Sequence, residues 1–296
     1  PFNYKNQLHF YFELSFFQRY DYFIEFSPDT IDLWYGVKNA KEIDKNRIFD
    51  ISLRANHQRS SGVTLAYTYK LEQSFQVKLA ASYLYADRLV NGVLTGRVLT
   101  FDEDYIGDIY VDYNYTEDIL FDRKNDAITG EGYALDVFLD WDASDQLTIS
   151  LSLEDVISEI IWEQVPVAMG MLSSDRVDFN DDGTVTSKPN LSGSQGFQDY
   201  TQRLPLRADL KAHYHFGSRY SGIGRWQRYD DFNYPSMGFS YITDKHNNVE
   251  LTYNLVTHGT MITLTSHSYS FHILSDNFSL SRANTLSLGL SLHWSL

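Results

Sequence analysis

Strict alternation of apolar and polar residues runs through long stretches of this sequence and limits the folds open to it. In segment 8–16 every even position is apolar, while the odd positions carry His, Tyr, Glu and Ser. Segment 285–296 repeats the pattern, with Leu or Trp at every even position. Successive side chains of a β-strand point to opposite faces, so this period predicts strands with one apolar and one polar face.

The same alternation recurs between the two ends of the chain. The clearer segments are 49–55, 63–70, 75–83, 105–114, 133–141, 147–154, 204–214 and 249–255. Weaker candidates are 20–26, 31–37, 91–100, 219–229, 235–243, 260–267 and 269–275. No linker rich in Pro, Gly or Ser separates these segments, so we expect one all-β domain over residues 1–296.

The connections between these segments fall into two sizes. Short connections are expected at 59–62, 142–145, 244–248 and 258–259, and long ones at 38–47, 87–104, 116–131 and 155–202. Segment 155–202 loses the alternation at its start. A structureless stretch of this length is unusual and often functional. We expect either a lumen plug, formed by a short helix or an inward fold, or an ordinary outer loop with its own hairpin.

Two architectures suit such strands: a soluble β-sandwich, whose apolar faces pack inward, and a transmembrane β-barrel, whose apolar face meets lipid. Many of the alternating runs last about 9–11 residues, the length that a tilted strand needs to cross a bilayer. Aromatic residues such as Tyr83, Trp141 and Tyr214 gather at the run ends, where barrels carry interfacial girdles. We therefore predict an antiparallel transmembrane β-barrel of about 14–16 strands, with a soluble all-β protein as the alternative.

The last strand carries a family resemblance. Leu288, Leu290, Leu292 and Trp294, ending at Leu296, resemble the C-terminal insertion signal of bacterial outer-membrane β-barrel proteins. That family usually ends in Phe or Trp, whereas this chain ends in Leu with Trp two residues earlier. The resemblance implies the outer membrane of a Gram-negative bacterium, with outer-membrane lipid and the barrel-assembly machinery as partners.

A second, fainter similarity covers segment 133–165, which includes the stretch Ile161-Trp162-Glu163-Gln164-Val165-Pro166. It is similar to barrels of the loose group that includes fatty-acid transporters and conjugation-associated barrels. This similarity implies the same outer-membrane barrel fold.

Charged residues fall on the polar face of the predicted strands, and acids outnumber bases there. An acidic lining favours cations and resists anions, although mixed signs on neighbouring strands can also pair and leave a lumen that conducts little. The net charge of −15 argues against a nucleic-acid partner, and the absence of cysteine excludes disulfides and thiolate chemistry. The predicted lumen-lining residues are Glu13, Asp50, Arg54, Lys78, Asp108, Asp112, Asp136, Asp140, Arg207, Asp209, Lys211 and Glu250.

Three functions remain open on the sequence. The first is a channel that passes hydrophilic neutral or cationic solutes, with polysaccharide export as one case. The second is a plugged, non-conducting barrel that serves as a scaffold or assembly partner for a periplasmic or other envelope protein.

The third function is a membrane-embedded hydrolase, because segment 56–62 resembles the His–Ser stretch of outer-membrane phospholipase A. In that family the base and the nucleophile lie two residues apart, whereas Arg59 follows His57 at that spacing. The serines come later, at 60 and 61, which breaks the geometry of a Ser–His pair. We therefore expect no enzymatic activity and no catalytic residues.

One stretch suggests a metal. Asp178, Asn180 and Asp182, followed by Gly183, resemble the opening of an EF-hand calcium loop, in which carboxylates at alternate positions surround the ion. The twelfth position, where a bidentate Glu belongs, is Pro189. An acidic hairpin turn explains the same residues, because Asp-Gly favours tight turns. Apart from this calcium, no cofactor is expected.

Overall fold

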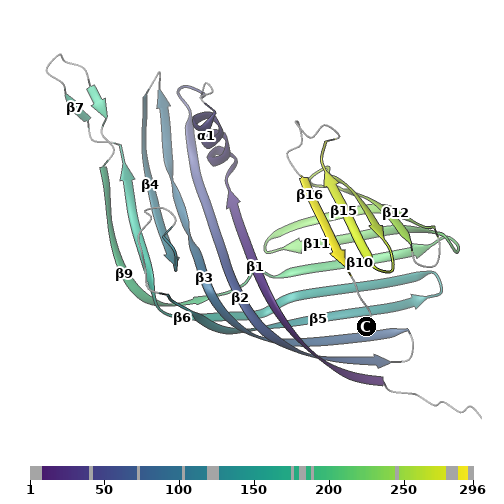
Figure 1. Cartoon of the computed structure of the whole chain (residues 1–296). Helices are drawn as coiled ribbons and strands as arrows, with labels where there is room; N and C mark the ends of the chain where they lie inside the picture. Colours follow the sequence, from purple (N-terminus) through teal and green to yellow (C-terminus); the bar gives the residue numbers. More distant parts are fainter. Residues whose placement is uncertain are drawn as a thin grey trace, which may run out of the picture.

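The structure is a computed structural model that describes residues 9–39, 43–71, 74–101, 104–118, 127–174, 177–179, 185–187, 190–243, 247–277 and 286–292. Within these residues the chain is almost entirely extended, with a single helix, α1 (Pro28–Lys38). The all-β prediction is therefore confirmed (Figure 1). No helix in the described ranges has the length and apolar character needed to cross a membrane.

The strands follow one another along the chain. They are β1 (His9–Phe26), β2 (Ile48–Leu71), β3 (Phe75–Phe101), β4 (Asp104–Tyr115), β5 (Gly130–Ser144), β6 (Leu147–Ser173), β7 (Val177–Phe179), β8 (Val185–Ser187), β9 (Asn190–Gln202), β10 (Arg207–His215), β11 (Tyr220–Tyr229), β12 (Phe232–Ile242), β13 (Asn248–Asn254), β14 (Thr260–Thr265), β15 (Tyr269–Ser275) and β16 (Leu286–Leu292).

In the described part of the chain, 14 strands form one sheet, and β7 and β8 form a separate hairpin. All pairs are antiparallel. β4 and β5 lie end to end between β3 and β6, and β9 and β10 lie end to end on the other side of β6. β1 and β16 occupy the two edges of the sheet.

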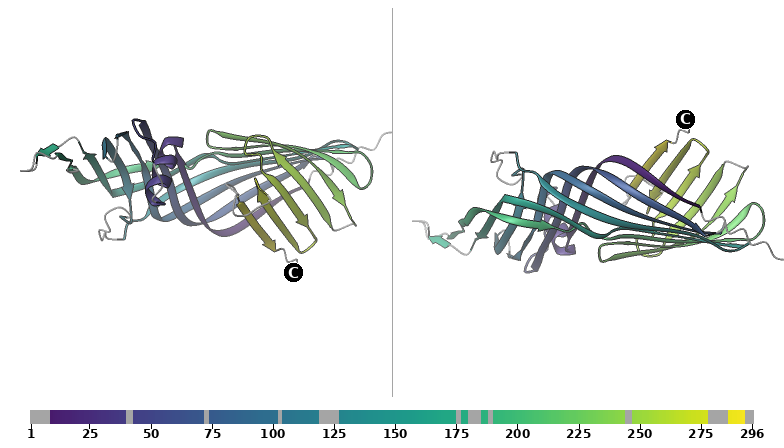
Figure 2. Two further views of the ribbon diagram at one scale, coloured as in Figure 1. Left: turned by 90° about the horizontal axis from the view of Figure 1, so that it is seen from above. Right: turned by 90° about the horizontal axis from the view of Figure 1, so that it is seen from below.

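The sheet curves strongly along its length (Figures 1 and 2). β5 and β10–β16 lie at one end, where the sheet curls round. β4, β9 and α1 lie at the other end, where the long strands rise away from that curl. We call this second part the extension; it comprises β4, β9 and the stretches of β1, β2, β3 and β6 beside them.

Three strands are much longer than expected. β2 has 24 residues, and β3 and β6 have 27 each. At about 3.3 Å per residue, 27 residues cover roughly 90 Å, about three times the thickness of a hydrocarbon core. The predicted connections at 59–62 and 87–104 are therefore wrong, because most of these residues continue β2 and β3.

The predicted loop or plug at 155–202 is also wrong in its first part and its last part. Residues 155–173 continue β6, residues 190–202 form β9, and between them β7 and β8 make the hairpin that one alternative foresaw. Register shifts explain the error. They occur in the pairing of β2 with β3 at Arg59/Ser60 and in that of β5 with β6 at Leu135/Val137. The first shift leaves Asp87 of β3 without a partner in β2, and the second sets residues 154–156 of β6 against Asp136 alone. Extra residues of this kind interrupt the alternation, so a continuous strand reads as a break.

Segment 31–37, a weak strand candidate, is helical because local capping signals decide its conformation. Ser27 accepts a hydrogen bond from the Thr30 amide (3.2 Å), and Pro28 stands in the first turn. The helix packs on β2 and β3 through Leu33, which contacts the buried cluster of Phe49, Ile51 and Val98.

A carboxylate ties α1 to the start of β2. Asp29 accepts hydrogen bonds from the backbone amide of Asp50 (2.9 Å) and from Nη2 of Arg47 (2.6 Å). These two hydrogen bonds, the backbone one first, lower the pKa of Asp29 below its usual range. The ionised carboxylate therefore holds the helix against the strand.

Lowering the pH should release this attachment. Because the pKa of Asp29 is lower in the folded chain, its contribution is complete above the unfolded pKa of about 3.9 and is lost as the pH falls through the lower folded value. We expect the fluorescence of Trp34, measured in a variant that keeps only this tryptophan, to stay constant above that range and to change below it. Asp29→Asn should give, already at neutral pH, the Trp34 fluorescence that the chain with Asp29 gives only at acid pH.

The control for this experiment is Asp32→Asn. Asp32 lies on the same helix and contacts Arg47 at the longer distance of 3.3 Å. This variant should keep the neutral-pH signal. An unchanged signal in Asp29→Asn would contradict the assignment.

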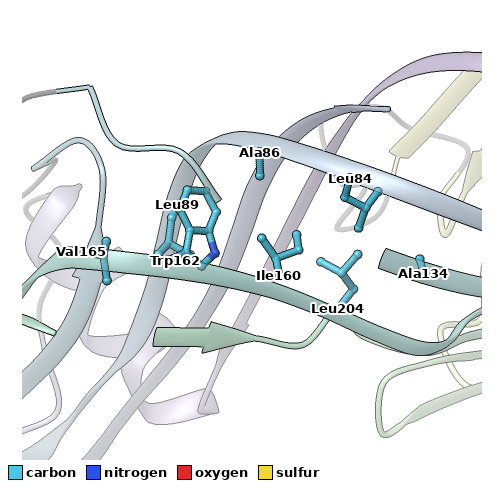
Figure 3. Close-up of a cluster of buried hydrophobic side chains, with 8 residues drawn as sticks. All are labelled: Leu84, Ala86, Leu89, Ala134, Ile160, Trp162, Val165 and Leu204. Atoms are coloured by element: carbon cyan, nitrogen blue, oxygen red, sulfur yellow. The ribbon is translucent and has the colours of Figure 1, made fainter. Parts of the chain in front are cut away.

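An apolar cluster fills the concave side of the sheet where it bends (Figure 3). Trp162 and Ile160 from β6 are fully buried there and face Leu84 and Leu89 from β3. Gly130 permits this packing, because a Cβ on it would meet the Trp162 ring at 2.6 Å. Leu204, in the link between β9 and β10, completes the cluster, so the bend holds a packed core.

Candidate functional site: the polar face and its charged latch

Neighbouring residues of paired strands show that the sheet has two chemically different faces. Directly opposed residues of antiparallel strands point to the same side, so a row can be followed across the sheet. One such row crosses eight strands and is wholly apolar. It consists of Phe10, Tyr69, Val77, Leu139, Leu151, Leu210, Trp226 and Pro235.

The row beside it, on the opposite face, is wholly polar. It consists of Lys70, Gln76, Asp140, Ser150, Lys211, Arg225, Ser236 and Asn254. Side chains on one side of the sheet are therefore apolar and those on the other are polar over the same set of strands.

The apolar side chains are exposed rather than packed. Phe16 is 78% exposed and Phe239 is 69% exposed. We call this surface the apolar belt. Its large exposed members are Phe10, Phe12, Leu14, Phe16, Leu65, Leu79, Tyr83, Tyr85, Tyr133, Leu135, Trp141, Ile157, Leu210, Tyr214, Trp226, Met237, Phe239, Leu251, Tyr253, Ile262, Leu264, Tyr269, Leu288, Leu290 and Leu292.

The residues predicted to line a lumen share the polar face. At the curled end of the sheet they are largely joined in pairs of opposite charge. Lys78 Nζ lies 2.7 Å from Glu13 Oε2, Lys211 Nζ lies 2.8 Å from Glu250 Oε2, and Arg225 pairs with Asp209. Glu13, Asp209 and Glu250 are thus each paired with a base, which lies on the neighbouring strand for Asp209 and across intervening strands for Glu13 and Glu250.

Three of the predicted residues lie elsewhere. Asp50, Asp108 and Asp112 project from the same face, but in the extension, away from β10–β16. Asp50 pairs with Arg97 at 2.9 Å, and both side chains are more than two-thirds exposed. These residues do not join the group at the curled end.

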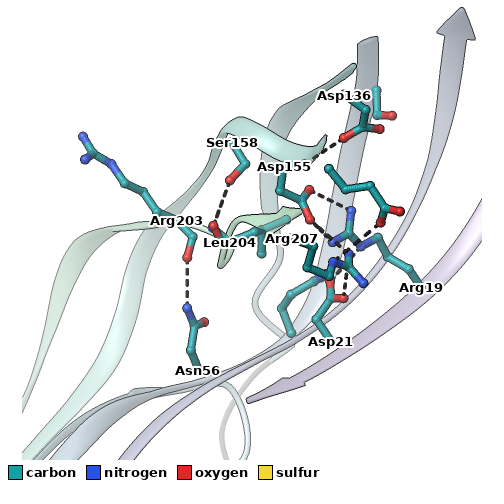
Figure 4. A network of polar contacts seen from close by, with 12 residues as sticks. Arg19, Asp21, Asn56, Asp136, Asp155, Ser158, Arg203, Leu204 and Arg207 are labelled. Carbon is teal, nitrogen blue, oxygen red and sulfur yellow. Dashed lines mark hydrogen bonds and ion pairs between the residues drawn. The ribbon is translucent and has the colours of Figure 1, made fainter. Parts of the chain in front are cut away.

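A network of charged side chains around one buried carboxylate crosses the concave side of the sheet, from β1 to β6 and β10 (Figure 4). Asp155 of β6, whose side chain is 1% exposed, accepts hydrogen bonds from Nη1 and Nη2 of Arg19 (3.0 and 2.7 Å) and from Nη2 of Arg207 (3.0 Å). Asp21 of β1 accepts a hydrogen bond from Nε of Arg19 (2.7 Å), and its Oδ1 lies 3.4 Å from Nη2 of Arg207. We call Arg19, Asp21, Asp155 and Arg207 the latch.

The latch joins strands that are not neighbours in the sheet. Arg19 and Asp21 come from β1, whereas Asp155 and Arg207 come from β6 and β10. A bulge presents Asp155 to them: its φ is +57°, and its backbone amide donates to Asp136 Oδ1 at 2.8 Å. The network therefore spans the concave side, from β1 to β6 and β10.

Hydrogen bonds between uncharged groups also cross the concave side, on the side of the latch toward the apolar cluster. Asn56 of β2 donates through Nδ2 to the carbonyl of Arg203 (2.9 Å), and its Oδ1 accepts from Gln202 Nε2 (2.6 Å). Ser158 Oγ accepts from the backbone amide of Leu204 (3.0 Å). The link between β9 and β10 is thus held inside the fold, against both β2 and β6 (Figure 4).

Arg54 of β2 also reaches across the concave side and contacts the turn between β11 and β12. Its Nη2 lies 2.6 Å from Asp230 Oδ2, and its Nε lies 2.9 Å from Glu25 Oε2. Phe23 packs beside it against the rings of Tyr229 and Phe232. Arg54 was predicted to face a lumen, and the structure places it at the wall-to-wall contact.

Sequence reasoning missed Arg19, Asp21 and Asp155 as site residues. Asp155 was assigned to the expected loop at 155–202, and it lies 136 residues from Arg19. A usable signal was present in the loss of alternation at Asp155, which marks the bulge.

The remaining sequence predictions have mixed outcomes. Of the calcium candidates, Asp178 lies in β7, while Asn180 and Asp182 lie outside the described residues. Within those residues, no cluster of three His, Asp or Glu side chains is close enough to hold a metal ion. Leu288, Leu290 and Leu292 lie on β16 and project from the apolar belt, and Trp294 and Leu296 lie outside the described residues.

His57 and Ser60 do not form a catalytic pair. The pairing with β1 places His57 opposite Tyr22 and Ser60 opposite Arg19. Since these positions differ by an odd number, the two side chains project from opposite faces of the sheet. The structure therefore separates His57 from Ser60.

Comparison with known proteins does not identify a family. No family model matches the chain, and no curated protein shows significant sequence similarity to it.

Removal of the central carboxylate should destabilise the fold strongly. Asp155→Ala removes the buried carboxylate that Arg19 and Arg207 share and leaves Asp21 as their common counter-ion. The loss of one partner from a buried pair costs about 3–5 kcal/mol. Because both arginines keep some exposure, we expect the lower end of that range, measured as the free energy of unfolding in urea.

The matched control is Asp50→Ala, which breaks an ion pair of the exposed type. Exposed pairs contribute about 0–1 kcal/mol, so this variant should unfold close to the unsubstituted protein. Equal destabilisation by the two substitutions would show that the latch contributes no more to the free energy of unfolding than an exposed ion pair does.

Proposed function

We propose that this chain forms the wall of a transmembrane β-barrel with a polar interior. The observation that carries the proposal is the apolar belt, which runs over the exposed face of β1–β3, β5, β6 and β10–β16. Soluble monomers rarely expose contiguous apolar patches beyond a few hundred Å². A face of this extent is stable against lipid, and the polar rows on the other face supply the matching interior.

The direction of the edge strands supports closure into a barrel. Strand direction alternates at each step across the sheet, so β1 and β16 run antiparallel to each other. Hydrogen bonding between these two edges would satisfy their free backbone groups, which lipid cannot do. The outer membrane of a Gram-negative bacterium, with the barrel-assembly machinery as partner, remains the proposed location.

The proposed activity is passage of hydrophilic neutral or cationic solutes, restricted at the latch. A polar cavity of about 300 Å³ lies beside the latch and is lined by Glu154, Arg207 and Asp209, among others. The interior thus offers polar space up to the point where Arg19 and Asp155 cross it. Opening requires the wall-to-wall ion pairs to part.

A second candidate is a barrel that does not conduct and acts as an envelope scaffold. Two observations favour it: the extension rises beyond the length that a bilayer requires, and the charges at the curled end are largely paired. In this alternative the latch is a permanent brace, and the extension meets a periplasmic or other envelope protein.

Planar-bilayer conductance distinguishes the two candidates. Arg207→Ala removes one arm of the latch while Arg19 still neutralises Asp155, so the channel proposal predicts a higher unit conductance than that of the unsubstituted protein. Arg225→Ala, which removes an arginine from the same face away from the latch, should change conductance less.

Two results would count against the channel. If both variants are silent although they insert and fold, the scaffold candidate is favoured. If the purified chain stays monomeric and soluble without detergent, the transmembrane proposal itself is wrong.

A further inference from the structure

A cavity of about 300 Å³ opens on the belt-side face of the sheet, where β1–β4 enter the extension. It lies outside the polar interior and is separate from the latch. Its walls are mainly aliphatic and aromatic. The lining that carries the argument consists of Tyr20, Tyr22, Leu53, Val90, Leu94 and Tyr113.

Two side chains in this lining each have one nitrogen atom without a hydrogen-bond partner. His57 is 5% exposed, and its Nδ1 is buried without a partner in the described structure. Arg88 Nε, also buried, is likewise without a partner there. Both residues line the cavity. Buried polar atoms are normally satisfied, so two such atoms at one cavity point to a group that is missing from it.

The surrounding side chains fix the His57 ring. The rings of Tyr20 and Tyr22 pack edge-on against it, with centroids 4.7 and 4.9 Å away. The imidazole is held in place beside the cavity, and its buried Nδ1 has no partner among the described residues. Such an arrangement resembles a preorganised binding position rather than a solvated surface histidine.

The charge of Arg88 is already compensated. Its Nη2 lies 2.5 Å from Glu117 Oε1, and its Nη1 donates to the Tyr20 hydroxyl at 3.2 Å. An anionic ligand would compete with Glu117 for the guanidinium. A neutral group that accepts from Nε and also exchanges a hydrogen bond with Nδ1 fits better, and a hydroxyl does both.

We infer that this cavity binds a neutral, mainly apolar molecule with a single hydroxyl group, such as an aromatic alcohol. The aromatic and aliphatic walls receive the apolar body, and His57 and Arg88 receive the hydroxyl. Sites of this kind are mostly apolar with a few placed polar groups, as here. The inference does not depend on conduction through the interior.

The test uses 2-naphthol as the probe and naphthalene as its partner without the hydroxyl. Binding to the whole chain, in one detergent, is followed by the fluorescence of each compound. We expect saturable binding of 2-naphthol and weaker binding of naphthalene, by about tenfold, which is the typical value of a hydrogen bond in a buried site.

Two substitutions on β2 locate the site. Ala55→Phe places a ring in the cavity lining and should abolish saturable binding. Ser61→Phe adds the same ring to the same face of β2 outside the cavity lining and should leave binding unchanged. Equal binding by the two variants would show that the probe dissolves in the belt or the detergent, and would overturn the inference.

A spectroscopic readout on the unsubstituted protein covers the case in which Ala55→Phe does not fold. In ¹⁵N-histidine spectra, 2-naphthol should shift the Nδ1 resonance of His57, identified by its loss in His57→Gln, whereas naphthalene should not. Absence of a shift at saturation, or equal affinity for the two probes, would overturn the assignment of the hydroxyl to His57 and leave a buried water as the partner of Nδ1.

Discussion

The rest of this structure depends on one buried carboxylate that two arginines share. Asp155 joins β1 to the neighbouring strands β6 and β10, with which β1 has no pairing in the sheet. A buried charge is costly unless it is fully paired, and here Arg19 and Arg207 supply three hydrogen bonds to it.

Separation of the two faces is the second organising constraint. Apolar side chains are exposed on one face of the curled sheet, while the charges gather on the other and pair across strands. The latch then fixes how far the two walls of the polar side can part. The two functions proposed for the chain, a channel and a scaffold, differ in whether that contact opens.

Much of the fold could be predicted from the sequence because one-sided exposure leaves a period of two. The segments around Leu65, Leu151 and Leu288 were placed on strands with the correct face outward. Bulges were not foreseen, since at Asp87 of β3 and Asp155 of β6 the interrupted alternation resembles a turn or a loop. Helix α1 was missed because its caps at Ser27 and Pro28 carry more weight than a short alternating run.

The candidate site was predicted in part. Alternation identified Lys78, Lys211 and Glu250 as residues of the polar face, since each sits in a clear run. It could not identify the partners of Arg207, because Arg19 and Asp155 approach it only once the sheet has folded over. Contacts between distant strands leave no local pattern. The cavity around His57 is of the same kind, being built from β1 to β4.

The central claim is that the apolar belt faces lipid while the apolar cluster at the bend does not. Quenching of tryptophan fluorescence by brominated lipid tests it most directly. Single-tryptophan variants that keep either Trp226, on the belt, or Trp162, in the buried cluster, are reconstituted with lipid brominated along its acyl chains. The account predicts strong quenching of Trp226 and little quenching of Trp162. Equal quenching of the two, or none of either, would contradict it.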